Sequence, residues 1–86
     1  MKIDFSGKNV LVTGSSGGIG RAICVAFSEL NARVHLHYNS NKEEAEKTIQ
    51  LLNGKNHSLN QADLSNPNEA KVMVNYIKNI DIIVNN

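Results

Sequence analysis

Apolar residues follow two alternating patterns along the chain. Short β-rich runs predict strands over residues 9–13, 33–38, 57–61 and 80–84. Between them, apolar residues recur every three or four positions, which predicts three helices. The residues expected on the inner helix faces are Ile19, Ile23, Phe27 and Leu30, then Ala45, Ile49 and Leu52, and finally Ala70, Met73, Val74 and Ile77.

Residues with helix-capping preferences set the expected boundaries. Ser40 and Glu43 have the spacing of a capping box, so the second helix is expected to begin near Ser40. Asn66 can cap the third helix, and Pro67 fits the first helical position. Asn31 is expected to end the first helix.

The order βαβαβαβ predicts an α/β fold, because short strands that alternate with amphipathic helices form parallel sheets with right-handed crossovers. The run 80–84 is apolar except at Asp81, which suits a sheet covered on both faces. We expect the strand order 3-2-1-4, with two helices on one face and one on the other. The 86 residues allow one small domain.

Composition and charge exclude several classes of function. Nine basic and eight acidic side chains give a net charge of +1, which attracts neither nucleic acid nor an anionic membrane. The single cysteine, Cys24, rules out an intrachain disulfide and a paired-cysteine zinc site. The first residues lack the apolar segment of a secretory signal, and no apolar run approaches membrane-spanning length. These features favour a cytoplasmic location.

A glycine-rich segment, residues 13–20 with the sequence TGSSGGIG, joins the first strand to the first helix. Main-chain N–H groups and the positive end of the helix dipole would bind a phosphate there. In a dinucleotide site Gly14 would allow the tight turn, Gly18 the close approach of pyrophosphate, and Gly20 close packing of the helix on the sheet. A Walker-type loop is excluded, because no Gly-Lys-Ser/Thr follows. Further hydroxyl donors are expected from Ser15 and Ser16.

Three motifs in order resemble the N-terminal part of the short-chain dehydrogenase/reductase family. They are the glycine segment, the pair Asp63-Leu64, and residues 81–86 with the sequence DIIVNN. The resemblance covers essentially the whole chain, and residues 5–8 add a likeness to 3-oxoacyl-(acyl carrier protein) reductases. It implies a Rossmann-type parallel sheet, here incomplete as the N-terminal half of a doubly wound fold. Residues 1–86 would form a partial NAD(P)-binding domain.

The family resemblance also implies cofactor contacts. The phosphates and ribose would contact four residues of the glycine segment: Gly14, Ser15, Ser16 and Ile19. Asp63 would accept a hydrogen bond from the adenine amino group, with the Leu64 main chain beside the ring. Asn86 would reach the adenosine ribose through its main chain. The alternative for Asp63 is a loop residue that turns the chain into the next helix.

The residues after the second strand bear on the choice between NADP and NAD. An acidic residue there would bind the ribose 2′-OH and repel a 2′-phosphate, but the first acid is Glu43, inside the expected helix. Gly17 stands where NADP-binding members often carry a basic residue, and Lys42 could replace it. We therefore expect NADP, with NAD as the alternative. The expected contacts are Tyr38, Asn39 and Ser40.

No catalytic residue is expected in this chain. The family uses a Tyr and a Lys four positions later on one helix, together with a Ser. Tyr38 and Lys42 have this spacing, but Tyr38 ends a strand and Lys42 begins a helix. The complete protein would reduce a small-molecule carbonyl substrate by hydride transfer, as a homo-oligomer, and these residues alone would be inactive. The alternatives are a nucleotide-binding module without chemistry and a truncated gene product.

The remaining polar residues have structural interpretations. His35 and His37 share one face of the second strand, and without a third ligand they are expected to pack or contact a loop instead of binding metal. Cys24 is expected to be a packed thiol. The charged residues of 42–47, Glu44 among them, are expected to form a solvated helix face.

Overall fold

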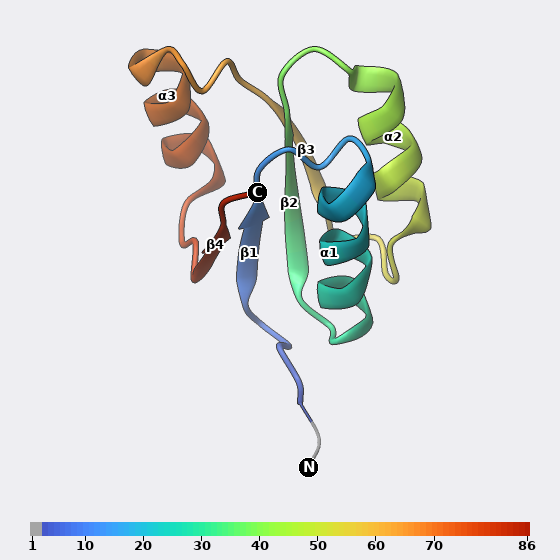
Figure 1. Cartoon of the computed structure of the whole chain (residues 1–86). Helices are drawn as coiled ribbons and strands as arrows, with labels where there is room; N and C mark the ends of the chain where they lie inside the picture. Colours follow the sequence, from blue (N-terminus) through green and yellow to red (C-terminus); the bar gives the residue numbers. More distant parts are fainter. Residues whose placement is uncertain (1–2) are drawn as a thin grey trace.

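Three helices and four strands alternate along the chain in the computed structural model, which describes residues 3–86. The predicted order βαβαβαβ is confirmed (Figure 1). In chain order the elements are β1 Asn9–Val12, α1 Gly18–Glu29, β2 Arg33–Tyr38, α2 Lys42–Leu51, β3 Ser58–Gln61, α3 Pro67–Ile77 and β4 Ile82–Val84.

The four strands form one parallel sheet with the order β3-β2-β1-β4, as predicted. In the register, Val10 of β1 lies beside Val34 of β2 on one side and Ile82 of β4 on the other. Helices α1 and α2 cover one face of the sheet, and α3 lies on the other side (Figure 1). Each crossover helix therefore returns the chain to the amino-terminal end of the next strand.

Side chains of the central strand alternate between two apolar clusters. Val10 and Val12 point toward α1 and α2, whereas Leu11 points toward α3 and packs with Ala62 and Met73. The first cluster is completed by Cys24, Ala32, Val34, Leu36 and Leu52. The burial of Cys24 confirms the expected packed thiol, and desolvation raises the pKa of this group.

The inner face of α1 agrees with the prediction at Ile23 and Phe27, which pack against the first cluster, but not at Ile19. The buried residues of the helix are Gly20, Cys24 and Ser28, while Ile23 and the neighbouring large side chains are only partly buried. Ile19, expected on this face, is 73% exposed. The fully buried positions of the helix thus carry small residues, and the larger apolar side chains pack beside them. Asn31 adopts a left-handed conformation just after α1, as expected of a helix-ending residue.

The start of α2 is also shifted from the predicted capping box. The cap is Asn41, whose side-chain oxygen accepts from the Glu44 N–H at 3.4 Å, and the helix begins at Lys42. Ser40 lies one residue before this cap and is exposed. The prediction of Ser40 as the cap was wrong, because two adjacent residues have cap-forming side chains and the later one reaches the third helical N–H.

In α3 the predicted cap is confirmed, but the buried face is narrower than expected. The Asn66 side chain accepts from the N–H groups of Asn68 and Glu69, and Pro67 opens the helix. Met73 is the buried residue of this helix, whereas Val74 is exposed. One helix lying on this side of the sheet buries a single row of side chains.

Strand β4 begins at Ile82 and is shorter than the predicted run 80–84. The residue before it, Asp81, is hydrogen-bonded to the first residue of β1. The Asp81 N–H donates to the Asn9 carbonyl, and its carboxylate accepts from the Asn9 N–H, both at 2.8 Å. This reciprocal pair fixes the start of β1 against β4. Among residues 3–86, no helix has the length and apolar character that crossing a membrane requires.

Candidate functional site

The sequence motifs converge at the carboxyl ends of the parallel strands. The connections that follow β1, β2 and β3, together with the residues after β4, all leave the same edge of the sheet (Figure 1). This edge is where ligands bind in open α/β sheets. The topology thus brings together residues that are more than seventy positions apart, such as Thr13 and Asn86.

The glycine segment makes an open turn and one very close contact. Gly14 and Gly18 have φ values of 64° and 56°, a conformation that favours glycine. A Cβ added to Gly18 would meet no heavy atom within 4 Å, so the main chain there faces open space. A Cβ added to Gly20 would lie 2.0 Å from the Gly14 carbonyl oxygen. The close packing predicted for Gly20 is therefore against the loop that precedes its helix.

The two serines of the segment have different environments. Ser15 is fully buried, and its hydroxyl donates to the Val12 carbonyl and accepts from the His37 N–H. Its own N–H donates to the His37 carbonyl at 2.8 Å. Ser16 is half-buried, and its hydroxyl makes no hydrogen bond with any residue in 3–86. Ser15 thus anchors the loop, and Ser16 keeps the hydroxyl that a ligand could use.

His37 joins three segments of the site. It is 4% exposed; its Nδ1 accepts from the Gly14 N–H at 3.1 Å, and its Nε2 lies 2.8 Å from the Ala62 carbonyl. Because a main-chain N–H can only donate, Nδ1 carries a lone pair and the ring is the neutral Nε2–H tautomer. The expected loop contact is confirmed. Its bridging role was not foreseen, since strand periodicity does not show which loops lie beside a strand end.

Arg21 ties the glycine segment to α2, a role that the sequence analysis missed. Its guanidinium donates to the Ser16 carbonyl, the Thr48 hydroxyl and the Glu44 carboxylate, each at 2.9 Å. Hydrogen bonds from Arg21 and then from Lys47 lower the pKa of Glu44. The Glu44 side chain remains 38% exposed, as expected of the solvated face, but it is also paired with Arg21. Arg21 and Glu44 belong to different helices, so no local spacing could indicate their contact.

Asn86 lies directly against the glycine segment. Its N–H donates to the Thr13 hydroxyl at 3.0 Å, and its side chain donates to the Gly14 carbonyl at 3.2 Å. The Thr13 hydroxyl also contacts the Asn85 side chain. These bonds join the ends of β1 and β4 next to the predicted phosphate loop. Ile19, another predicted contact, is exposed on the first turn of α1.

Asp63 and Leu64 lie where the chain leaves β3 for α3. Asp63 Oδ1 accepts from the N–H and the hydroxyl of Ser65, which lowers the pKa of this carboxyl group. This arrangement corresponds to the turn-forming alternative for Asp63. Its other carboxylate oxygen has no hydrogen bond within residues 3–86, so the turn leaves one acceptor available. Leu64 is exposed.

The three residues expected beside the ribose lie at the end of β2 and after it. Tyr38 is buried, and its carbonyl accepts from the Ala62 N–H, whereas Asn39 and Ser40 are exposed at the rim. Tyr38 belongs to β2 and Lys42 to α2, as the sequence analysis expected. The two therefore lack the shared helix face that catalytic residues of this spacing need.

His35 lies at the other end of β2, away from the candidate site. It is buried, with Nε2 3.0 Å from the Asn9 side-chain oxygen and Nδ1 2.6 Å from the Ser58 hydroxyl. Burial lowers the pKa of His35, and the charges of Arg33 and His57 add to this effect. The expected packed role of His35 is confirmed.

Acidification is therefore expected to destabilise the fold through His35. In the unfolded chain the His35 ring binds a proton below the ordinary pKa of 6.5. In the folded chain burial makes this protonation less favourable, so it requires a lower pH. The free energy of unfolding should thus be unaffected by this group above pH 6.5 and should fall as the pH drops below it. Urea denaturation across this range checks the sign. The variant His35→Gln should lose this slope; an unchanged slope would contradict the assignment.

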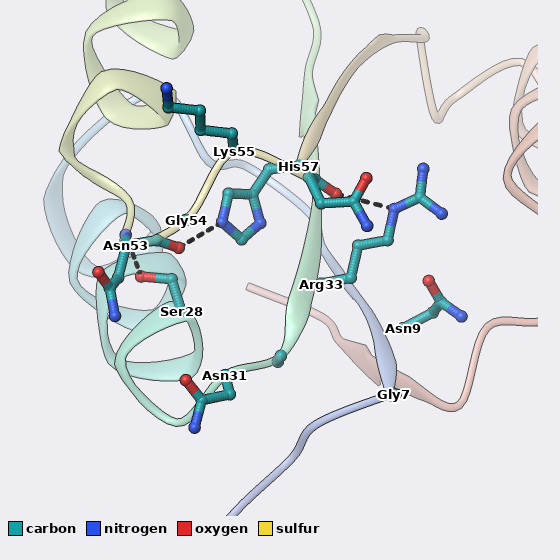
Figure 2. Close-up of a pocket in the computed structure, with 11 residues that line it drawn as sticks. Gly7, Asn9, Ser28, Asn31, Arg33, Asn53, Gly54, Lys55 and His57 are labelled. Atoms are coloured by element: carbon teal, nitrogen blue, oxygen red, sulfur yellow. Dashed lines mark hydrogen bonds between the residues drawn. The ribbon is translucent and has the colours of Figure 1, made fainter.

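A concave region lies at the end of the sheet opposite the candidate site. This cavity, of about 480 Å³, lies between the end of α1 and the connection from α2 to β3 (Figure 2). Its polar lining includes Asn31, Arg33, Lys55 and His57 but no part of the glycine segment. Within residues 3–86, no group of three or more His, Cys, Asp or Glu side chains is placed to hold a metal ion.

Comparisons with known proteins agree with this geometry. The profile of the family described as short chain dehydrogenase matches residues 8–86. The chain is 38% identical over 87 residues to the 3-oxoacyl-[acyl-carrier-protein] reductase FabG of Rickettsia typhi, covering 98% of this chain and 34% of that protein. It is 38% identical over 86 residues to versicolorin reductase 1 of Aspergillus parasiticus, covering 93% and 33%.

Among solved structures, BdcA in complex with NADPH superposes with a TM-score of 0.83 at 30% identity, covering 94% of this chain and 32% of BdcA. The chain belongs to the short-chain dehydrogenase family, and within it resembles the FabG-type reductases. It spans about a third of the length of the two curated relatives named above.

Proposed function

We propose that this chain forms the NADP-binding part of a short-chain reductase that transfers hydride to a carbonyl substrate. The observation that carries the proposal is the convergence of the glycine segment, Asn39, Asp63 and Asn86 at the carboxyl edge of the sheet. On this reading residues 1–86 are a partial Rossmann domain. The reduction of a 3-oxoacyl or similar group is proposed by analogy with FabG.

The residues present fit a dinucleotide. The open main chain at Gly18 and the amino end of α1 would take the pyrophosphate, with the Ser16 hydroxyl as a further donor. The remaining acceptor of Asp63 would receive the adenine amino group. When bound, the nicotinamide supplies the hydride. The residues of this chain hold and orient the cofactor, with Asn86 fixed beside the loop.

Selectivity for NADP would come from the exposed residues that follow β2, here called the rim. Asn39, Ser40 and Lys42 are exposed there, and the first acid, Glu43, lies inside α2. A 2′-phosphate at this rim would therefore meet donors and a cation instead of a carboxylate. The nearby Glu44 carboxylate is paired with Arg21, which reduces its repulsion of an anion.

The proton donor and substrate pocket are proposed to lie outside these residues, so that the chain alone does not turn over a substrate. Homo-oligomer formation and a cytoplasmic location are proposed for the complete protein; the single cysteine is consistent with a reducing compartment. The second candidate is a nucleotide-binding module. It is favoured by the hydrogen bonds that His37, Arg21 and Asn86 make to the glycine segment and to Thr13 at its start.

The proposal is tested by titrating the chain with NADPH and NADH while following nicotinamide fluorescence. Lys42→Gln is expected to weaken NADPH binding by about three- to tenfold and leave NADH binding unchanged, because it removes one charge-assisted contact. Lys47→Gln, on the same helix and paired with Glu44, is the matched control. Absence of binding of either dinucleotide to the folded chain would refute the proposal.

A further inference from the structure

The connection between α2 and β3 contains a chemically reactive pair of residues. Asn53-Gly54 is the single Asn-Gly sequence in the chain. Both residues are exposed and lie outside regular secondary structure, and both line the concave region opposite the candidate site (Figure 2). An asparagine followed by glycine can be attacked by the next main-chain nitrogen, since glycine has no side chain to obstruct the approach.

The groups that would react have no competing partners. Across residues 3–86, neither the Gly54 N–H nor the Asn53 carboxamide makes a hydrogen bond. The carboxamide points away from the His57 ring in Figure 2. The main-chain N–H and carbonyl of Asn53, in contrast, both make hydrogen bonds. Its N–H donates to the Ser28 hydroxyl at 3.0 Å, and its carbonyl lies 2.7 Å from His57 Nε2.

The tautomer of His57 is fixed by its other nitrogen. Nδ1 accepts from the Val34 N–H at 2.9 Å, so the proton is on Nε2 and is donated to the Asn53 carbonyl. This oxygen belongs to the same peptide unit as the Gly54 nitrogen. When that nitrogen loses its proton, resonance spreads the negative charge onto the oxygen. The His57 N–H would stabilise this anion, as an oxyanion donor does.

We propose that Asn53 is a site of spontaneous deamidation promoted by His57. Hydroxide removes the Gly54 N–H proton, and the nitrogen forms a bond to the Asn53 side-chain carbonyl carbon. The bond from that carbon to its amino group breaks, and ammonia leaves with a proton from water. Water then opens the cyclic imide to aspartate or isoaspartate. The net reaction consumes one water, releases one ammonia and involves no oxidation or reduction.

The products change the local structure. Isoaspartate lengthens the main chain between the N–H bonded to Ser28 and the carbonyl bonded to His57. Either product adds a carboxylate to a cavity margin that carries Arg33 and Lys55. We expect the isoaspartate form to melt at a lower temperature than the unmodified chain, because it cannot keep both hydrogen bonds in the same geometry.

The experiment incubates the purified chain at mildly alkaline pH and follows each asparagine by peptide mass spectrometry. Asn53 is expected to convert before all other asparagines. In His57→Phe, which lacks the donor, the rate at Asn53 should fall about tenfold, the usual value of one hydrogen bond to a charged group. Circular dichroism establishes that the variant is folded. His35→Phe is the control for replacing a histidine by phenylalanine, because His35 makes its hydrogen bonds to Asn9 and Ser58 and not to Asn53.

Equal rates in the folded wild type and the folded His57→Phe variant would overturn the proposal, as would faster conversion at another asparagine. If the variant does not fold, the wild type is compared with and without guanidinium chloride. The His57 bond exists only in the folded chain. Faster conversion of Asn53 without denaturant then supports the proposal, and an equal or slower rate overturns it.

Discussion

Replacing Gly20 with alanine is expected to lower the free energy of unfolding by about 3 kcal/mol. The added Cβ would lie 2.0 Å from the Gly14 carbonyl oxygen and 2.9 Å from the Asn86 side-chain nitrogen. The carbonyl belongs to the main chain of a loop fixed by Ser15 and His37, so it cannot move aside cheaply. Urea denaturation followed by circular dichroism measures the loss.

Gly17→Ala is the matched control for this prediction. Gly17 lies in the same loop with an extended φ of 177°, and its added Cβ would meet nothing within 4 Å. Its free energy of unfolding should differ from wild type by less than about 1 kcal/mol. If Gly20→Ala were as stable as Gly17→Ala, the close approach of α1 to its preceding loop would be wrong.

His37→Leu is expected to lower the free energy of unfolding by about 2–4 kcal/mol, because two main-chain groups lose their buried partner. These groups are the Gly14 N–H and the Ala62 carbonyl, which bond to opposite sides of the ring. Leucine fills part of the space but offers neither an acceptor nor a donor. The measurement is the free energy of unfolding from denaturant titration of wild type and variant under the same conditions.

His37→Gln provides the rescue that separates hydrogen bonding from packing. The glutamine amide carries both an acceptor and a donor, so it can serve the two main-chain groups in part. It should recover a measurable share of the stability lost in His37→Leu. Two variants of equal stability would show that the imidazole contributes by volume alone.

The order of elements and the sheet topology were predictable, because they follow from periodicity and from general rules for parallel sheets. The Asn66 cap and the packed Cys24 were also predictable, since both depend on local chemistry. The inner face of α1 was only partly predictable. Apolar periodicity correctly indicated Ile23 and Phe27, but Ile19 is exposed, and the buried positions Gly20 and Ser28 are not apolar. Hydropathy cannot show where a helix lies so close to a neighbouring segment that only a small residue fits between them.

The candidate site was predictable as a set of motifs, but its internal contacts were not. The glycine segment, Asp63 and Asn86 were identified from the sequence, and the topology brings their loops to one edge. Arg21 and His37 hold that edge together through partners more than twenty residues away. Such contacts depend on how helices and strands are placed in three dimensions, which no spacing in the sequence encodes.

The network around the glycine segment has a consequence for the entropy of ligand binding. His37 holds Gly14 from the strand side, and Arg21 holds Ser16 from the side of α2. The loop is therefore preorganised before a ligand arrives. Ordering a loose loop on association costs about 0.5–1.5 kcal/mol for each side chain immobilised. A dinucleotide that enters here would therefore avoid most of the entropic cost of ordering this loop.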